Sequence, residues 1–369
     1  MRLLFASTVP HLPHNIGGMQ TSTHALALGI RAHGHAVAAF GSLPRESSPR
    51  DPGGESAPTN SPINPRAWSV DEQLSYPTYR AIRAIPAFGN ILAHWRPDIV
   101  VVPFGAGTAP LAAIALDSGA KVALYAHSAE PRDLAVTPIA RPEVCLIANS
   151  GFTAKRLQTL LAITVPIVPP LIDPALYRVT RRSEDSRGND SGGHVVLVNP
   201  TQLKGAEIFF RLAEARPSIP FLAVESWNIS DEWRTVLANR ARALGNVSLW
   251  PANEDMREVF AQARLVLMPS IHEETFGRAV AEAQVSGIPA LVSDRGALPE
   301  TLGEGGIVVP LDAGADAWAA ALDRIWSDAS VYRQAAAAAL RQASLAERNP
   351  DRIIETFLQL LQGLHEGRG

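Results

Sequence analysis

Short apolar runs alternate with helical stretches along most of the chain. Near its start, the run RLLFAS is followed by two glycines, a helical stretch over residues 19–33 and a second apolar run, HAVAAFGS. DIVVVPFG, KVALYAHS and EVCLIANS continue the pattern, and each run ends in small or polar residues. Strands with two apolar faces are typical of parallel sheets that helices cover on both sides. The pattern predicts a first α/β domain with a doubly wound sheet over residues 1–180.

A polar segment separates this series from a second one. The sequence TRRSEDSRGNDSGG at 180–193 has no apolar side chain, so residues 181–193 are predicted to form a flexible linker. Apolar runs resume with HVVLVNP and continue through PFLAVES, NVSLWPA, ARLVLMPS and IPALVSD. Helical stretches lie between them, which predicts a second α/β domain over residues 194–345.

Length, charge and cysteine content narrow the class of protein. With 369 residues the chain is long enough for two domains that each bury a core. The net charge of -3 and the scattered basic residues argue against nucleic acid as a partner. The single cysteine, Cys145, lies in an apolar run, which indicates a buried strand residue in a reducing compartment.

No segment reads as a membrane span or a leader. The start MRLLFAS has too short an apolar core for a signal peptide, and prolines and glycines break the uncharged stretch at 99–116. We therefore expect a cytoplasmic protein without a membrane span.

The segment PSIHEETFGRAVAEAQVSGIP at 269–289 contains the strongest candidate chemistry. A polar turn with Gly277 leads into a helix that is predicted to begin near Phe276. Unpaired N–H groups at a helix start favour an anion such as a diphosphate, and glycine lets it approach closely. Glu282 would lie about 9 Å along the helix at ~1.5 Å per residue, which suits a nucleoside. Glu274 on the turn would face a sugar, because carboxylates accept paired hydrogen bonds from vicinal hydroxyls.

The same segment resembles the signature of the family 4 retaining glycosyltransferases, which have the GT-B fold. The likeness rests on Glu274 and Glu282 with seven residues between them, on the Phe-Gly pair inside that spacing, on the Gly-Ile-Pro that follows, and on GALPE at 296–300. The spacing of the two glutamates alone is weak evidence, whereas the whole cluster is fairly specific. The alternative is an ordinary helix with solvated glutamates.

The resemblance implies two doubly wound, Rossmann-like domains that face each other across a cleft, with the donor bound mainly by the second domain and the acceptor by the first. It also implies that a last helix, over residues 346–369, crosses back to the first domain. No cofactor is implied, because a nucleoside diphosphate sugar is the co-substrate. The residues implied to bind this donor are Gly17, Gly18, Trp250, Thr275, Phe276, Gly277, Glu282, Gly296 and Ala297.

Three side chains are candidates for catalysis. Lys204 follows the run VVLVNP and precedes a helix, so its charge can neutralise a diphosphate as the bond to the sugar breaks. His127 ends the run KVALYAH, at a strand end where an imidazole can hydrogen-bond the transferred sugar. The resemblance has a Lys-Gly pair and a histidine at these two places, with Glu274 as the third residue. A solvated lysine and a structural histidine are the alternatives.

Glycines and loops complete the expected site. Gly17 and Gly18 precede a helix, where their backbone amides can approach a phosphate or an acceptor sugar; a glycine turn without a ligand is the alternative. The resemblance suggests that amides of 296–300 and Glu300 shape the donor-sugar pocket, with turn formation as the equal alternative. Trp250 lies where a GT-B enzyme receives the nucleotide base.

The chain departs from the family pattern in two places. Asn199 and Pro200 stand where an arginine beside a glycine is usual, so one phosphate contact is missing or supplied elsewhere. Ser226 and Trp227 stand where glycines are common, which changes the loop beside the nucleotide. No Asp-x-Asp occurs and the histidines are not spaced as a metal cluster, which predicts an enzyme that works without a metal.

Two further features have alternative interpretations. The proline-rich stretch at 44–66 is either a loop that meets the acceptor or a disordered insertion. An aromatic and basic group forms either the core or an acceptor or peripheral membrane-surface patch, and core packing is favoured. Its members are Trp68, Tyr76, Tyr79, Arg80, Arg83 and Trp95.

The function that these features favour is hexosyl transfer. The donor is predicted to be a UDP-sugar, or next a GDP-sugar, and the acceptor a hydroxyl of a glycan, a lipid-linked sugar or a small molecule. Retention of anomeric configuration is implied by the resemblance. One alternative is a sugar-nucleotide epimerase or hydrolase on the same fold, which needs no acceptor. The other is a non-catalytic nucleotide-sugar-binding module, which the missing arginine supports.

Overall fold

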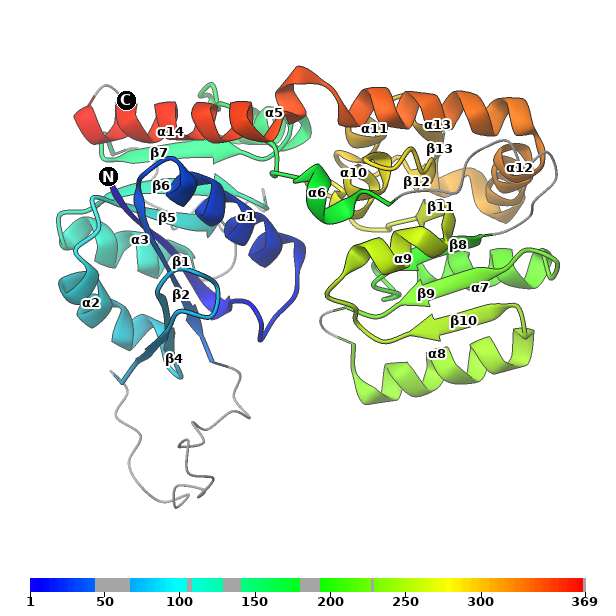
Figure 1. Cartoon of the computed structure of the whole chain (residues 1–369), viewed down its shortest axis with the longest axis horizontal. Coiled ribbons are helices and arrows are strands. Elements are labelled where there is room, and N and C mark those ends of the chain that lie inside the picture. The colour runs from blue at the N-terminus through cyan, green and yellow to red at the C-terminus, as the bar shows by residue number, and fades with distance from the viewer. Residues whose placement is uncertain (44–66, 105–107, 129–140, 180–192, 227–228, 368–369) are drawn as a thin grey trace, which may run out of the picture. The chain divides into compact units, whose positions relative to one another are not determined.

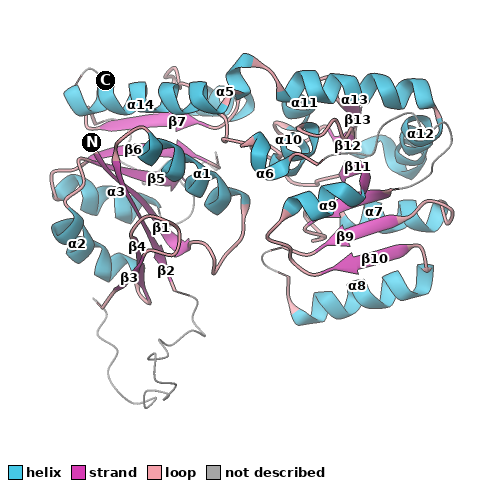
Figure 2. Cartoon of the chain, viewed as in Figure 1, coloured by secondary structure: helices cyan, strands magenta, loops and turns pink. Residues whose placement is uncertain are grey.

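The chain folds into two compact units (Figures 1 and 2). The structure is a computed structural model that describes residues 1–43, 67–104, 108–128, 141–179, 193–226 and 229–367. Unit 1 comprises Met1–Asn149, Thr153–Val168 and Asp351–Gly369, and unit 2 comprises Ser150–Phe152 and Pro169–Pro350. The predicted loop at 44–66 and residues 181–192 of the predicted linker lie outside the described residues.

Unit 1 contains a seven-stranded sheet in the order β3-β4-β2-β1-β5-β6-β7, and only β3 and β4 pair antiparallel. Its strands are β1 (Arg2–Pro10), β2 (Ala36–Ser42), β3 (Ser69–Asp71), β4 (Thr78–Ala81), β5 (Ile99–Phe104), β6 (Lys121–Ala126) and β7 (Val144–Ala148). Its helices are α1 (Gly18–Ala32), α2 (Ala84–Trp95), α3 (Thr108–Asp117), most of α5 (Gly151–Leu161) and α14 (Pro350–Glu366). Cys145 lies in β7 as a free, half-buried thiol.

The central strands of unit 1 are apolar on both faces because helices flank the sheet (Figure 2). Leu3 and Leu4 are neighbours in β1 and point to opposite faces, yet both are fully buried. Tyr76 and Tyr79 are also buried, which confirms core packing for this part of the aromatic group. Arg80 is buried beside them and pairs with Asp71 at 2.6 Å.

The last helix, α14, packs on unit 1. The ring of Phe357 is fully buried and lies 5.6 Å from the ring of Tyr125, centroid to centroid. At the other end of the helix, Lys121 Nζ donates to the carbonyls of Leu364 at 2.6 Å and His365 at 2.9 Å. A cation stabilises a helix C-terminus because the last carbonyls have no partner within the helix. Pro350 is tolerated at the start of α14 because the first N–H groups of a helix have no partner within it, so the N–H that proline lacks is not needed there.

Unit 2 contains a six-stranded parallel sheet in the order β10-β9-β8-β11-β12-β13. Its strands are β8 (His194–Val198), β9 (Phe221–Val224), β10 (Val247–Trp250), β11 (Ala263–Met268), β12 (Ala290–Ser293) and β13 (Gly306–Val309). Its helices are α6 (Pro174–Tyr177), α7 (Ala206–Ala215), α8 (Asp231–Leu244), α9 (Met256–Gln262), α10 (Arg278–Gln284), α11 (Leu298–Leu302), α12 (Gly314–Ser327) and α13 (Ala329–Ala343), with short 3-10 helices at η2 (Leu311–Ala313) and η3 (Ala346–Arg348).

The strand order creates a switch point in each sheet. From β8 the chain proceeds to β9 and β10 on one side, and from β11 to β12 and β13 on the other. The loops after β8 and β11 therefore diverge and leave a crevice at the carboxyl ends of these strands, where doubly wound sheets bind ligands. In unit 1 the corresponding pair is β1 and β5.

The chain enters unit 2 earlier than the apolar pattern predicts. The pattern assigns residues 169–179 to the first domain, whereas the contacts assign them to unit 2. Ile172 and Tyr177 pack in the core of unit 2, and the Val179 N–H donates to Ser286 Oγ at 2.9 Å. Unit 2 also extends to Pro350 instead of 345. Tertiary contacts fix both limits, and the local sequence does not reveal them.

Within the described part of the chain, none of the helices has the length and apolar character needed to cross a membrane.

Candidate functional site

Three loops of unit 2 meet at the carboxyl ends of β8, β11 and β12. The Ile271 N–H donates to the carbonyl of Leu203 at 2.9 Å, which joins the loops after β11 and β8. The Ala297 N–H donates to the carbonyl of Glu274 at 2.7 Å, which joins the loops after β12 and β11. These backbone bonds bring Lys204 and Glu274 to the switch point of the sheet.

Two glycines allow this close approach. Gly205 has φ +81° and Gly296 has φ +64°, a region that disfavours side chains. A β-carbon at Gly205 would lie 2.1 Å from the carbonyl oxygen of Pro269, and one at Gly296 would lie 2.1 Å from that of Glu274. Neither distance is tolerable, so each crossing of two loops requires glycine.

The Glu274 carboxylate is the centre of the cluster. Its Oε1 atom accepts hydrogen bonds from Lys204 Nζ at 2.5 Å and Ser270 Oγ at 2.6 Å, and His272 Nε2 lies 3.0 Å from it. Glu274 is buried, so the lysine charge and the hydroxyl offset the loss of water around its own charge. Within the described residues no hydrogen bond reaches Oε2, which leaves this oxygen as an acceptor for a ligand.

Ser270 and His272 were not among the predicted site residues. Ser270 lies in the quoted segment, and its hydroxyl is fully buried against Glu274. The pKa of His272 is below its ordinary value because the ring is partly buried. The nearby Glu274 raises this pKa, and Lys204 lowers it. The sequence signal that could have found both is their position in the turn just before Glu274.

Glu282 lies in α10, but the predicted start of that helix is wrong. Gly277 precedes the helix with φ +88°, so α10 begins at Arg278 and Glu282 is nearer the helix start than expected. The reason is that a residue in the left-handed region cannot continue a right-handed helix. Glu282 is buried, and its Oε1 lies 2.6 Å from Arg278 Nε.

Burial raises the pKa of Glu282 above its ordinary value, and Arg278 and Tyr177 offset part of this rise. Arg278 also donates to the Tyr177 hydroxyl at 2.9 Å and to the carbonyl of Leu171 at 3.2 Å. The carboxylate predicted to bind ribose is therefore held by a buried arginine and a tyrosine.

The remaining predicted donor residues differ in what they offer. Phe276 is buried in the core of unit 2, while Thr275 is half-exposed. Gly296 forms an isolated parallel bridge with Glu274. The N–H of Ala297 is already used by Glu274, so this amide holds the loop.

Glu300 and Trp250 make backbone contacts. The Glu300 carboxylate accepts from the N–H groups of Gly151 and Phe152 at 2.8 and 2.9 Å, which supports the alternative structural role. Trp250 ends the edge strand β10, and its carbonyl accepts from the Glu225 N–H at 2.9 Å. These bonds hold the Glu300 side chain and the Trp250 backbone in place.

The two departures from the family pattern lie after β8 and β9. Asn199 directly follows β8, is buried and has φ +61°, which asparagine tolerates better than most residues. It provides an amide and no positive charge at this position. Ser226 follows β9, and Trp227 lies outside the described residues.

The predicted residues of unit 1 lie at the start of a helix and at the end of a strand. Gly17 precedes α1 without a side-chain cap, and Gly18 begins the helix. His127 directly follows β6, with its ring 4.5 Å from that of Tyr125, centroid to centroid.

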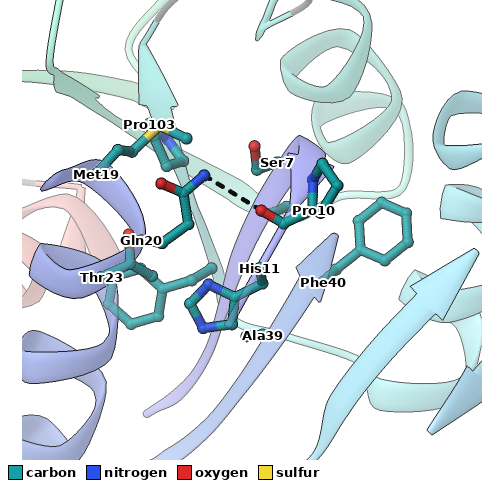
Figure 3. Close-up of a pocket in the computed structure, with 11 residues that line it drawn as sticks. Ser7, Pro10, His11, Met19, Gln20, Thr23, Ala39, Phe40 and Pro103 are labelled. Atoms are coloured by element: carbon teal, nitrogen blue, oxygen red, sulfur yellow. Dashed lines mark hydrogen bonds between the residues drawn. The ribbon is translucent and has the colours of Figure 1, made fainter. Parts of the chain in front are cut away.

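A hollow lies near the switch point between β1 and β5 in the unit 1 sheet (Figure 3). Gln20 Nε2 donates across it to the carbonyl of Pro10 at 3.2 Å. Its lining comprises Phe5, Ala6, Ser7, Pro10, His11, Met19, Gln20, Thr23, Ala39, Phe40 and Pro103. His11 Nε2 and His24 Nδ1 lie 3.0 and 2.8 Å from the Tyr76 hydroxyl, so a buried polar network supports one wall.

The part of the chain that the structure describes contains no group of three or more histidine, cysteine, aspartate or glutamate side chains that could hold a metal ion. Independence from metals therefore stays a prediction from the sequence.

Two family models match the chain. The model described as Glycosyltransferase Family 4 matches residues 16–176, and the model described as Glycosyl transferases group 1 matches residues 211–328. The chain belongs to the family 4 glycosyltransferases. This confirms the resemblance seen in the sequence.

Solved structures of other glycosyltransferases show the same fold. A sucrose-phosphate synthase from Thermosynechococcus elongatus is 18% identical, with a TM-score of 0.74 over 99% of each chain. The Anabaena protein HepE, in complex with UDP and glucose, is 16% identical, with a TM-score of 0.73 over 98% of this chain and 99% of its own. The predicted α/β class and GT-B fold, with two parallel-sheet units, are confirmed.

A curated relative matches a shorter stretch. The D-inositol 3-phosphate glycosyltransferase of Corynebacterium kroppenstedtii is 40% identical over 77 residues. The match spans 20% of this family 4 chain and 17% of the relative's length.

Proposed function

We propose that this family 4 glycosyltransferase transfers a hexose from a UDP-sugar to a hydroxyl group of an acceptor, with retention of anomeric configuration. The observation that carries the proposal is the contact of Lys204 Nζ with Glu274 Oε1 at 2.5 Å, at the switch point of the unit 2 sheet. A cation and a carboxylate with one free oxygen are the groups that a diphosphate and a sugar require.

Lys204 would hold the diphosphate. An ammonium group has three N–H donors, and Glu274 uses one of them in the structure. The other two can bind phosphate oxygens and stabilise the charge that develops on the leaving diphosphate. Glu274 Oε2 would accept hydrogen bonds from hydroxyls of the hexose, and Glu282 from those of the ribose.

The bond changes follow from this arrangement. The bond from the sugar C1 to the β-phosphate oxygen breaks and leaves its electron pair on the diphosphate. A bond from C1 to the acceptor oxygen forms on the same face, and the acceptor proton passes to the leaving phosphate oxygen. Lys204 stabilises the departing charge. Because the acceptor attacks C1 from the face that the diphosphate leaves, retention requires no covalent bond to Glu274.

The choice of UDP is supported by the fold relative HepE, which was solved with UDP and glucose and with UDP alone. The base, the hexose and the acceptor of this chain are proposals. The roles of His127, Gly17 and Gly18, the absence of a metal requirement and the cytoplasmic location also stay predictions.

The test is a transfer assay with UDP-hexoses and a panel of hydroxyl acceptors, read by mass spectrometry and by the anomeric coupling constant of the product. We expect a product with the donor's anomeric configuration. Glu274→Gln should reduce transfer by more than about a hundredfold, since the neutral amide cannot replace the carboxylate. Glu273→Gln, a change in the exposed neighbouring glutamate, is the matched control and should keep activity near wild type.

Other outcomes have distinct meanings. Free or epimerised sugar without any acceptor product would favour a hydrolase or an epimerase. Inverted configuration would contradict retention, and full transfer by Glu274→Gln would contradict the role of this residue.

A further inference from the structure

Glu282 forms an ion pair with a residue of its own helix. One turn earlier in α10, Arg278 places Nε 2.6 Å from Glu282 Oε1. Only 12% of the arginine side chain and 8% of the glutamate side chain are exposed. Residues four apart lie on the same helix face, so the pair is built into the sequence spacing.

Two contacts from outside the helix fix the arginine. Its Nη2 donates to the Tyr177 hydroxyl at 2.9 Å, and its Nη1 donates to the carbonyl of Leu171 at 3.2 Å. The Tyr177 hydroxyl in turn favours the ionised form of Glu282 and lowers its pKa, because a hydroxyl can donate to a carboxylate. The guanidinium is planar and rigid, so these contacts also fix the direction of Glu282.

We infer that Arg278 and Tyr177 are positioning residues that hold the Glu282 carboxylate ionised and aimed at the ribose hydroxyls of the donor. This inference rests on the proposed function and deepens it, because it assigns recognition of the ribose to a buried group of three side chains.

The physical reason is the cost of a buried charge. Burial alone would favour the protonated acid, which donates at one oxygen and loses part of its capacity to accept. The charged and titratable groups that act on Glu282 are Arg278 and Tyr177, and both oppose that protonation. An ionised carboxylate has about four acceptor positions. Even with one position each for Arg278 and Tyr177, two remain for a vicinal pair of hydroxyls.

A purely structural role predicts a different result from a positioning role. If the three side chains only tie residues 171–177 to α10, their loss should weaken binding of every nucleotide to the same extent. If they position Glu282, the loss should fall on nucleotides that have ribose hydroxyls. Comparison of UDP with 2′,3′-dideoxy-UDP separates the two roles.

The experiment is isothermal titration of both nucleotides into wild type, Arg278→Met, Arg278→Lys and Tyr177→Phe. We expect wild type to prefer UDP by about tenfold or more. Arg278→Met should bring the ratio close to one, while its affinity for the dideoxy nucleotide stays within about threefold of wild type. Arg278→Lys keeps the positive charge but lacks the planar guanidinium with its several donors, so it should recover part of the preference for UDP.

The pH dependence gives a second readout. In Arg278→Met the pKa of Glu282 rises further, so the preference for UDP should return as the pH increases and the carboxylate ionises. Tyr177→Phe keeps the ring and should lower the ratio by about threefold, which tests the inference even where Arg278→Met does not fold.

An unchanged UDP preference in Arg278→Met and Tyr177→Phe would overturn the inference, as would equal losses for the two nucleotides. Neither of those results would contradict the proposed function. A wild-type protein that binds neither nucleotide would contradict both.

Discussion

At the scale of single residues, the two buried glutamates of the candidate site have specific partners. Glu274 is held by Lys204 and Ser270, and Glu282 by Arg278 and Tyr177. A buried charge without such partners costs several kcal/mol, so the partners are required for the carboxylates to be ionised.

His11 in unit 1 illustrates the opposite solution, a buried group kept neutral. Burial first, then the nearby His24 and Arg80, lower its pKa to about 3. The unfolded chain has an ordinary histidine pKa of about 6.5, so it binds a proton between pH 6.5 and 3 that the folded protein does not bind. Stability should therefore be constant above pH 6.5 and fall as the pH decreases below it.

The measurement is urea unfolding of wild type and His11→Asn between pH 4.5 and 7.5. Wild type should lose up to about 1.4 kcal/mol per pH unit through this residue, and the variant should lose correspondingly less. Parallel pH profiles for the two proteins would show that His11 does not titrate as described.

Residue spacing in the sequence was enough to single out Glu274, Glu282 and Lys204 as candidates, because the family signature is local. It did not reveal Ser270 or His272 beside Glu274, since their contact depends on the path of the turn. The sequence also did not predict the positive φ angle of Asn199.

At the scale of elements, the candidate site depends on loops that cross at glycines. Gly296 touches the backbone of Glu274, and Gly205 touches that of Pro269. The alternation of apolar runs predicted the strands that these loops follow. The predicted start of α10 was wrong because the conformation of Gly277 is set by its surroundings.

Gly296→Ala should destabilise unit 2 by clearly more than a left-handed conformation alone costs. The added β-carbon would lie 2.1 Å from the carbonyl oxygen of Glu274. The matched control is Gly245→Ala in the same unit, where φ is +75° and no heavy atom lies within 4 Å. The control should cost about 1–2 kcal/mol by calorimetric thermal unfolding. Equal losses for the two variants would show that the loops do not cross as described.

At the scale of the whole molecule, distant parts of the sequence form each unit. Unit 1 is completed by α14, and unit 2 begins with the segment that contains Ile172 and Tyr177. Composition and pattern predicted two α/β domains, but the limits between them depend on contacts that no local pattern shows.

Phe357→Ala in α14 should weaken unit 1 selectively. Removal of a fully buried phenylalanine costs about 3–5 kcal/mol, and its ring packs against Tyr125 of β6. Hydrogen exchange read by mass spectrometry should become faster in β6 and α14 and stay unchanged in the unit 2 sheet. Gln359→Ala, an exposed change in the same helix, is the control. Faster exchange confined to unit 2 would contradict the assignment of α14.

Lys204 and Glu274 are proposed to form a site for a nucleoside diphosphate sugar. The most direct test is thermal unfolding and titration calorimetry of wild type, Lys204→Ala and Lys155→Ala with UDP, GDP, ADP and dTDP. Lys155 is exposed in unit 1 and is the control lysine. We expect UDP to raise the melting temperature of wild type and of Lys155→Ala, and to bind Lys204→Ala about tenfold or more weakly. Binding of no nucleotide by wild type, or equal UDP affinity in Lys204→Ala, would contradict a donor site at these two residues.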